Sequence, residues 1–191
     1  MDNRLRSNDD GKIDTEAFCE VCIVTSGRSK NRVASNAANK PLFDLAQTQL
    51  REGKFVDAEA TGRRLVAAAP KNAEAHILLA DAQRQRGRPH DAVSTFRNAL
   101  AIDPDNATAH YLLGCALLDA KRVAEAEFAF KDAIAANPGL AEAHLDLGNL
   151  FLNQRQLADA ESAYRSAIAA RQTYATAHFN LGNVLRDTNR P

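Results

Sequence analysis

The stretch AHYLLGC at Ala109–Cys115 decides the fold, because it returns at a fixed distance along the chain. Its relatives are AHILLAD at Ala75–Asp81, AHLDLGN at Ala143–Asn149 and AHFNLGN at Ala177–Asn183. Each copy carries one histidine, and these histidines follow one another at intervals of 34 residues. A fixed period of this size indicates stacked supersecondary units, so each copy marks the same position in successive units of one array.

The period divides the chain into four complete units and one partial unit, at residues 39–72, 73–106, 107–140, 141–174 and 175–191. In the second unit, apolar periodicity predicts a helix over Ala73–Arg86 with Asn72 as its N-cap. Gly87 suits a left-handed exit from this helix, and Pro89 suits the first turn of a second helix that Pro104 ends. The other units repeat this plan, which predicts a pair of helices in each complete unit.

At these positions the chain resembles the tetratricopeptide repeat family, whose pattern is Trp-x2-Leu-Gly-x2-Tyr, then Ala-x3-Phe, then Pro. The third unit supplies the matching set His110, Leu113, Gly114, Leu117, Ala126, Phe130, Ala133 and Pro138. The first unit fits less well, because Gly62 stands where the aromatic belongs, and glycine within a helix costs about 1 kcal/mol relative to alanine. The resemblance implies an all-α fold, a right-handed α-solenoid of about four and a half helix-turn-helix units. It also implies that small residues of the first helices, such as Gly114 and Gly148, face alanines of the second helices.

Residues 1–39 differ from the array in composition, since Ser, Asn, Asp, Gly and charged residues dominate without sustained periodicity. We expect a mostly flexible N-terminal arm there, followed by the array at residues 40–191. Cys19 and Cys22 form a lone CxxC in this arm. A zinc site would need further ligands, and a thioredoxin-like site would need a βαβ context. We therefore interpret the pair as chance or structural, with redox or metal chemistry as the alternative.

The composition gives no sign of a nucleic-acid or membrane partner. Lys plus Arg and Asp plus Glu both total 24, so no global field attracts anionic partners. No apolar run approaches the roughly 20 residues of a membrane span, and the first residues are too polar for a secretory signal. We expect a cytoplasmic protein that binds neither nucleic acid nor membrane.

The repeated histidines, His76, His110, His144 and His178, are the first candidates for chemistry. A zinc ion needs ring nitrogens about 2.0–2.1 Å away, whereas equivalent residues of stacked units are separated by about 8–10 Å or more. These histidines also occupy the place of the family's tryptophan, so we interpret them as structural. No Ser/His/Asp order, phosphate-binding glycine loop or paired-carboxylate pocket stands out. We therefore predict no enzyme activity, no metal and no cofactor.

The candidate binding surface comes from helix geometry. Positions 2, 5, 9, 12 and 13 of each first helix cluster opposite the core side, and in tetratricopeptide repeats this face lines a concave groove that binds extended peptides. We predict partner-binding residues on and beside this face: Glu74, Ile77, Asp81, Arg84, Tyr111, Cys115, Leu118, Glu142, Leu145, Asn149, Asn153, Phe179, Asn180, Asn183 and Arg186. Position 5 is apolar in every unit, which fits either supporting packing or contact with a ligand. The expected ligand is an extended or helical peptide with apolar anchors and some polar or basic character.

Two functions follow from this interpretation. The first is a non-enzymatic scaffold that binds a protein or peptide in the groove. The second is the substrate-recruiting part of a larger transferase, since the array resembles those of protein O-linked N-acetylglucosamine transferases and related glycosyltransferase- or sulfotransferase-like enzymes. Those arrays hold substrate backbone with an asparagine ladder. Here Asn180 matches the ladder and Asn149 and Asn183 lie nearby, while Leu78, Leu112 and Asp146 interrupt it.

The last predicted helix has an apolar face without a following helix to cover it. This face carries Leu181, Val184 and Leu185. We expect either that the natural polypeptide continues or that another chain covers this end, which makes self-association through the open C-terminal helix a further possibility to test.

Overall fold

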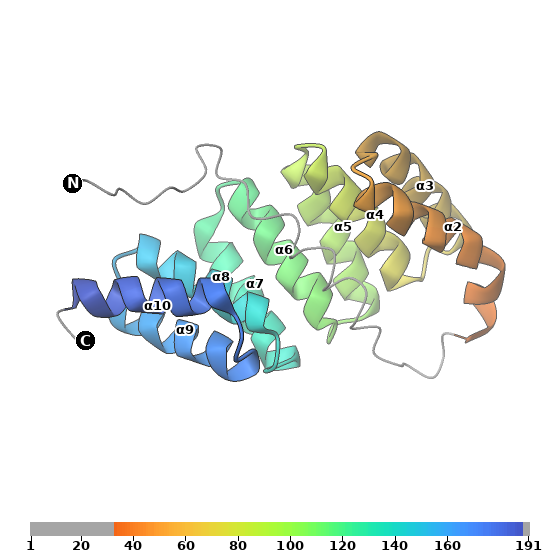
Figure 1. Cartoon of the computed structure of the whole chain (residues 1–191). Helices are drawn as coiled ribbons and strands as arrows, with labels where there is room; N and C mark the ends of the chain where they lie inside the picture. Colours follow the sequence, from red (N-terminus) through yellow and green to blue (C-terminus); the bar gives the residue numbers. More distant parts are fainter. Residues whose placement is uncertain (1–32, 189–191) are drawn as a thin grey trace.

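The computed structural model describes residues 33–188, which form α-helices without strands, so the expected all-α fold is confirmed for this range (Figure 1). The helices are α2 Val33–Arg51, α3 Phe55–Ala68, α4 Ala73–Gln85, α5 Pro89–Ile102, α6 Ala107–Asp119, α7 Val123–Ala136, α8 Ala141–Asn153, α9 Leu157–Ala170 and α10 Ala175–Asp187. Most of the expected arm, with Cys19 and Cys22, lies outside the described residues. Helix α2 begins at Val33, before the predicted start of the array at residue 39, and Pro41 lies inside it.

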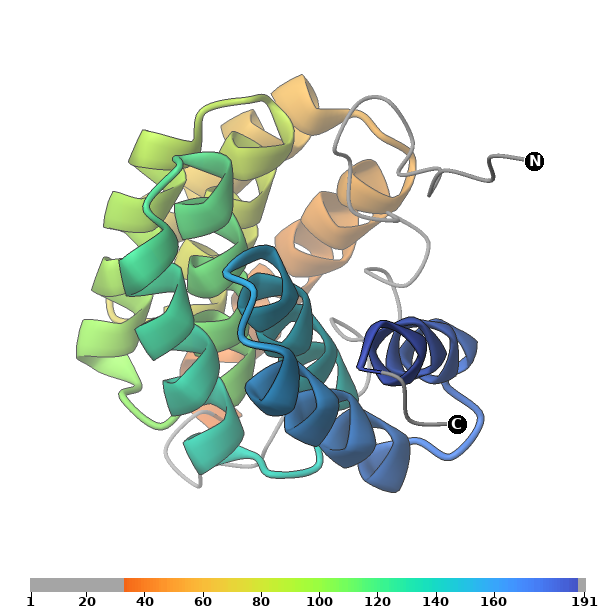
Figure 2. The same cartoon turned by 90° about the vertical axis from the view of Figure 1, so that its left-hand side faces the viewer.

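The helices alternate between two layers of a curved array. Even-numbered helices line the inner side of the curved array, which can be followed in Figure 2. We call α2, α4, α6, α8 and α10 the inner helices, and α3, α5, α7 and α9 the outer helices. The first four inner helices each pack on the outer helix that follows, α10 packs on the preceding α9, and neighbouring inner helices such as α4 and α6 also touch. None of the helices in residues 33–188 is long and apolar enough to span a membrane.

The turn after each of the first four inner helices contains one residue in the left-handed conformation. These residues are Gly53, Gly87, Lys121 and Arg155, with φ of 70°, 73°, 62° and 63°. The left-handed exit predicted at Gly87 is confirmed, and the same backbone geometry returns every 34 residues. In the third and fourth units a residue with a side chain occupies this position, although glycine is favoured there.

Close packing between the two helices of a unit depends on glycines in the inner helices. A β-carbon added to Gly114 would lie 2.5 Å from Cε1 of Phe130, and one added to Gly148 would lie 2.7 Å from Cε1 of Tyr164. The atoms nearest to these two glycines are thus those of the ring on the following helix, and the space that glycine leaves is filled by that ring. Gly62, which replaces this ring in the first unit, has its own role: an added β-carbon would lie 2.9 Å from the Cα of Leu79. Glycine at this position lets α3 approach the backbone of α4.

Each repeated histidine has a hydrogen-bond partner at the equivalent position of its own turn, which the sequence pattern did not reveal. In each, Nε2 lies within hydrogen-bond distance of the carbonyl oxygen six residues earlier, in the turn that enters the inner helix. The pairs are His76 with Pro70 at 3.0 Å, His110 with Pro104 at 2.7 Å, His144 with Pro138 at 2.9 Å and His178 with Gln172 at 2.8 Å. These four imidazoles are structural ties between a turn and the helix that follows it.

Candidate functional site

The predicted binding residues lie on the inner helices, but they differ in accessibility. Ile77, Asp81, Tyr111, Cys115, Glu142 and Leu145 are buried. Glu74, Arg84, Leu118, Asn149, Asn180 and Asn183 are partly buried, and Asn153, Phe179 and Arg186 are exposed. The helical wheel treats each helix alone, whereas the inner helices pack side by side and cover much of one another. A prediction from the wheel therefore overestimates how much of this face is open.

Position 5 of the inner helices forms an apolar row that we call the inner stripe, consisting of Ile77, Tyr111, Leu145 and Phe179. The first three are buried and belong to the hydrophobic cores. Tyr111 packs against Phe130, with 5.9 Å between the ring centroids. Phe179 is 64% exposed at the end of the stripe. The stripe thus serves packing over most of its length and presents an accessible aromatic on α10.

Polar side chains beside the inner stripe are joined from helix to helix in what we call the polar chain. The Tyr111 hydroxyl donates to Oδ2 of Asp146 at 3.0 Å, which joins α6 to α8. Oδ1 of Asn149 accepts from the Tyr164 hydroxyl at 2.8 Å and from Nδ2 of Asn180 at 2.9 Å, which joins α8 to α9 and α10. A longer contact of 3.4 Å from Nδ2 of Asn149 to Oδ1 of Asp146 closes the series. The polar chain fixes the relative positions of three consecutive units.

Burial dominates the protonation chemistry of this region. Burial raises the pKa of Asp146 to about 6, against the opposing hydrogen bonds from Tyr111 and Asn149. It also raises the pKa of Tyr164 to about 12 and the pKa of the Cys115 thiol. A thiol kept neutral and buried in this way lacks the thiolate that a nucleophile needs.

A charged group lies on the inner face between α4 and α6. Nη1 of Arg84 donates to Oδ2 of Asp119 at 3.2 Å, which joins the second unit to the third. Nη2 of Arg84 lies 3.7 Å from Oδ1 of Asp81, which is too long for a hydrogen bond. Asp81 is only 5% exposed, and its Oδ1 has no hydrogen-bond partner among the described residues. Burial raises the pKa of Asp81, although Arg84 opposes this effect.

Sequence reasoning missed the central role of Asp146 and did not include it among the predicted site residues. It was interpreted as an interruption of an asparagine ladder, but it lies within the polar chain and accepts from two neighbours. The signal available was its place three residues before Asn149 on one helix, since such residues share a face. Its bond to Tyr111 of another unit depends on how the units stack, which the wheel does not describe.

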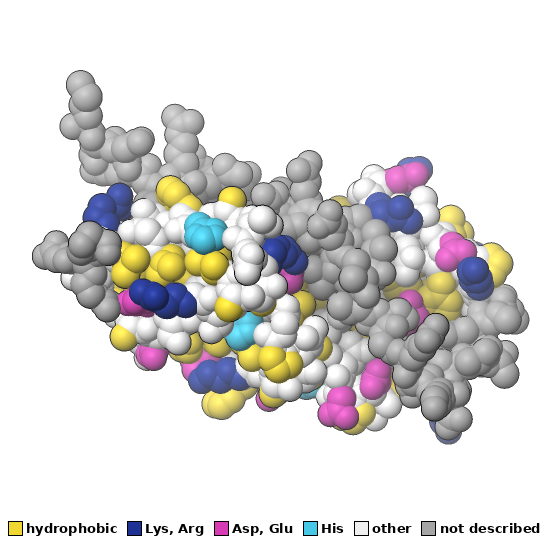
Figure 3. Space-filling view, turned by 60° about the horizontal axis from the view of Figure 1, so that its bottom comes forward, with side chains coloured by type: hydrophobic (Ala, Val, Ile, Leu, Met, Phe, Trp, Pro, Cys, Tyr) yellow, Lys and Arg dark blue, Asp and Glu magenta, His cyan; other side chains and the backbone are white. Residues whose placement is uncertain are grey.

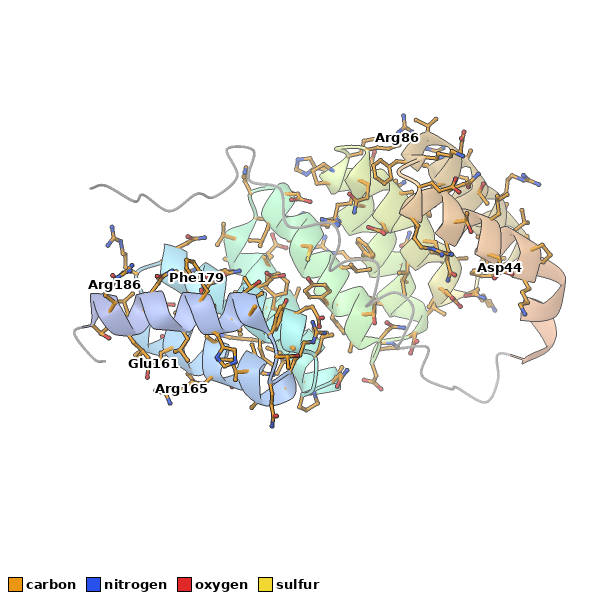
Figure 4. The ribbon with its side chains drawn as sticks, viewed as in Figure 1. Asp44, Arg86, Glu161, Arg165, Phe179 and Arg186 are labelled. Atoms are coloured by element: carbon orange, nitrogen blue, oxygen red, sulfur yellow. The ribbon has the colours of Figure 1, made fainter. Side chains whose placement is uncertain are left out.

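The end of the array at α10 is more open than the rest. A β-carbon added to Gly182 would meet no atom within 4 Å, in contrast to those on Gly114 and Gly148. Hydrophobic side chains gather at this end of the molecule in Figure 3. Figure 4 shows Phe179 on the side of α10 away from Glu161 and Arg165 of α9. The accessible part of the inner face is therefore on α10.

The described residues contain no group of three or more His, Cys, Asp or Glu side chains arranged to hold a metal ion. The four repeated histidines each engage a different backbone carbonyl. What the inner face offers chemically is therefore a surface of apolar contacts, amides and carboxylates, suited to binding a chain with complementary groups.

Comparison with known proteins identifies relatives of this architecture. A profile described as tetratricopeptide repeat matches residues 43–93, 77–141 and 145–191. Among solved structures, the pilF protein of Pseudomonas aeruginosa has a TM-score of 0.76 and 22% identity, covering 81% of this chain and 71% of that chain. MamA from Desulfovibrio magneticus RS-1, solved from residue 41 to its end, has a TM-score of 0.69 and 23% identity, covering 82% and 88%.

A third solved structure contains a bound peptide. The first repeat domain of Spaghetti (RPAP3), bound to the HSP90 peptide SRMEEVD, has a TM-score of 0.59 and 18% identity, covering 62% of this chain and 94% of that chain. At these identities the likeness shows a shared fold. The comparison with curated protein sequences found no significant match.

Proposed function

The chain belongs to the tetratricopeptide repeat family, and from this premise we propose that its inner face binds an extended or helical segment of a partner protein. The observation that carries the proposal is the inner stripe flanked by the polar chain, which combines apolar contacts with amide groups on consecutive units. A segment bound here would place an apolar side chain against the exposed Phe179 and would meet the partly buried amides of Asn149 and Asn180 beside it. We propose a binding role and no catalytic one.

The charge of the inner face indicates what kind of segment it favours. The five inner helices together carry seven carboxylates and four basic side chains, a net charge of −3, and the excess of carboxylates lies on α4, α6 and α8. One of these carboxylates, Glu142, pairs with Arg171. The peptide bound to the Spaghetti domain, SRMEEVD, has three acidic residues and one basic residue. An acidic peptide of that kind would be repelled by this inner face. We expect a ligand with apolar anchors next to Arg or Lys.

Two exposed phenylalanines provide a matched test. Phe179 lies on the inner helix α10 and is 64% exposed, whereas Phe128 lies on the outer helix α7 and is 68% exposed. Because neither is buried, replacing either with serine should leave the fold intact. A peptide selected from a displayed library on the full chain should bind Phe179→Ser at least 10-fold more weakly by fluorescence anisotropy, and Phe128→Ser with unchanged affinity. Equal affinities for both variants and the unmodified chain would place binding elsewhere.

Recruitment of substrates to a transferase is the second candidate function. It is favoured by the paired amides of Asn149 and Asn180 on adjacent inner helices, because the transferase arrays that this chain resembles hold peptide backbone with asparagines. Asn180→Ala should then weaken binding of many unrelated peptides by a similar factor, because backbone contacts do not depend on sequence. Loss confined to one peptide sequence would favour the first function.

A further inference from the structure

One side of α10 carries a row of exposed residues at regular helical spacing. We call this row the α10 seam, and it consists of Ala175, Phe179, Gly182 and Arg186. At 100° per residue these four positions fall within an arc of about 60°. Figure 4 shows Phe179 and Arg186 on the same side of α10, away from α9. The α10 seam is therefore a face of this helix that the described residues leave uncovered.

The spacing of the α10 seam suits a second α-helix. Its residues follow one another at intervals of four, three and four, the alternation by which two helices pack side by side through knobs and holes. This series reads the same in both directions, with its centre between residues 180 and 181. In two antiparallel copies of α10, Phe179 therefore lies opposite Gly182 of the other copy, and Ala175 lies opposite Arg186. A small residue faces a large one at each of these levels.

Glycine at the position of Gly182 accommodates an aromatic ring elsewhere in this array. The ring of Phe130 comes within 2.5 Å of a β-carbon built on Gly114, and the next unit repeats this arrangement. At Gly182 such a β-carbon would meet no atom within 4 Å. The ring of Phe179, which is 64% exposed, stands three residues earlier on the same helix. Antiparallel pairing of two copies brings these features together, so that the ring of each copy fills the space above the glycine of the other.

The polar residues on and beside the α10 seam do not oppose this pairing. α10 carries one acidic and one basic side chain, so the two paired helices have no net charge. The two Arg186 residues are offset by about 16–17 Å along the pair, which exceeds the Debye length of about 8–10 Å. On one flank, Thr176 of each copy lies beside Asn183 of the other, where a hydroxyl and an amide can form a hydrogen bond. The α10 seam thus matches a second copy of itself in charge as well as in shape.

We propose that two copies of this chain form a symmetric dimer in which their α10 helices pack antiparallel along the α10 seam, with Phe179 of each copy over Gly182 of the other. Such a contact is isologous, because the same pair of residues meets on both sides of the two-fold axis. An interface of one helix from each copy is small, so the dimer dissociates on dilution. It also covers Phe179, so a partner segment that binds this ring under the proposed function displaces the second copy.

The mass of the full chain in solution tests the dimer. Sedimentation equilibrium at increasing concentration should show the mass rising from 20.7 kDa towards twice this value. Phe179→Gly or Phe179→Ala removes the ring, and Gly182→Phe sets two rings against each other, so each should raise the dissociation constant of the dimer by about 10-fold or more. Phe128→Gly, which removes an exposed ring from the outer helix α7, should leave it unchanged. An unmodified chain that remains a monomer at every concentration would overturn the inference.

Exchange of the two residues tests how the helices are paired. In the double variant Phe179→Gly, Gly182→Phe, each ring again faces a glycine, so the dimer should recover the affinity of the unmodified chain. An equimolar mixture of the two single variants should also dimerise, because one copy then supplies both rings and the other both glycines. Circular dichroism of each variant should match that of the unmodified chain, since both residues are exposed. If neither the double variant nor the mixture dimerises while the unmodified chain does, the proposed pairing is wrong.

The library-selected peptide relates the dimer to the proposed function. At saturation it should convert the unmodified chain to peptide-bound monomers, because both contacts use Phe179, and a dimer that persists with peptide bound through this ring would overturn the inference. If the exchange restores the dimer but no peptide binds, the proposed function fails and the dimer stands. If a peptide binds in a Phe179-dependent way and the exchange does not restore the dimer, the dimer fails and the proposed function stands.

Discussion

At the scale of single residues, two glycines at equivalent positions have opposite surroundings. A β-carbon on Gly148 would clash with the Tyr164 ring at 2.7 Å, whereas one on Gly182 would meet nothing within 4 Å. Gly148→Ala should lower the free energy of unfolding by about 1–3 kcal/mol through overpacking. Gly182→Ala should raise it by up to about 1 kcal/mol, because alanine is the better helix former. Urea unfolding of both variants checks this, and equal effects would show that the ring is free to move.

The buried carboxyl of Asp146 makes stability depend on pH. Its pKa of about 6 in the folded state exceeds the ordinary aspartate pKa of 3.8, so its contribution to stability is complete below pH 3.8 and is lost as the pH rises through 6. Burial is the main cause, Glu142 adds to it, and Tyr111, Asn149 and Arg84 oppose it. Asp146→Asn should therefore raise the free energy of unfolding by about 1–3 kcal/mol at pH 7.5.

The same substitution should have little effect at pH 4, where the carboxyl of Asp146 is largely protonated. Thermal or urea unfolding of both proteins at the two pH values measures the difference. Asp159→Asn, which removes an exposed carboxylate on α9, serves as the control. If Asp146→Asn stabilises the protein equally at both pH values, the effect does not come from the charge of the Asp146 carboxylate.

At the scale of the elements, the left-handed backbone conformation occurs in all four of these turns, whereas glycine, which adopts it most easily, occurs in two of them. Lys121 and Arg155 adopt φ of 62° and 63° where Gly53 and Gly87 stand in the first two units. A residue with a β-carbon pays about 1–2 kcal/mol for this conformation. Lys121→Gly should therefore stabilise the array by about 0.5–1 kcal/mol, and Gly87→Ala should destabilise it by about 1 kcal/mol.

Gly87→Ala isolates the backbone effect, because an added β-carbon there meets no atom within 4 Å. Differential scanning calorimetry of both variants gives the comparison. If Lys121→Gly destabilises the array instead, contacts of the lysine side chain outweigh the strain of its backbone.

The period of 34 residues predicted where the helices lie with good accuracy, because caps, turns and apolar positions recur together. It predicted the exit at Gly87 but gave no sign of the same geometry at Lys121 and Arg155, where the stacking of helices imposes the turn on other residues. It also missed the first turns of α2 from Val33, since residues 33–38 have the composition of the preceding arm. Local composition therefore predicts the end of a helix poorly, and the ends of helices are the least sharply defined part of their assignment.

At the scale of the whole molecule, we propose the exposed side of α10 as the surface through which the chain self-associates. Leu181 and Leu185 are partly buried, Leu181 packs against the last core cluster, and an added β-carbon at Gly182 beside them would meet no atom within 4 Å. We expect the chain to associate through this face at high concentration, and Leu185→Lys to shift the protein towards the monomer. Light scattering over a range of concentrations measures this, and an unmodified chain that stays monomeric at every concentration would rule it out.

The candidate site was only partly predictable, because its key contacts join different units. The wheel placed Tyr111, Asn149 and Phe179 on one side of their helices. It could not show that Tyr111 is buried and bonded to Asp146, or that Asn149 and Asn180 meet. These contacts depend on the angle between units, which a helical period leaves undefined.

The tie between each repeated histidine and the carbonyl six residues earlier has a consequence for how such a chain can change over generations. Each histidine lies near the start of its unit and its acceptor lies near the end of the unit before, so every unit carries the histidine of one tie and the acceptor of the next. Gln172 replaces proline at the acceptor position without loss of the bond, because the acceptor is a backbone oxygen. The array can therefore lengthen or shorten by whole units while each new junction is already complete.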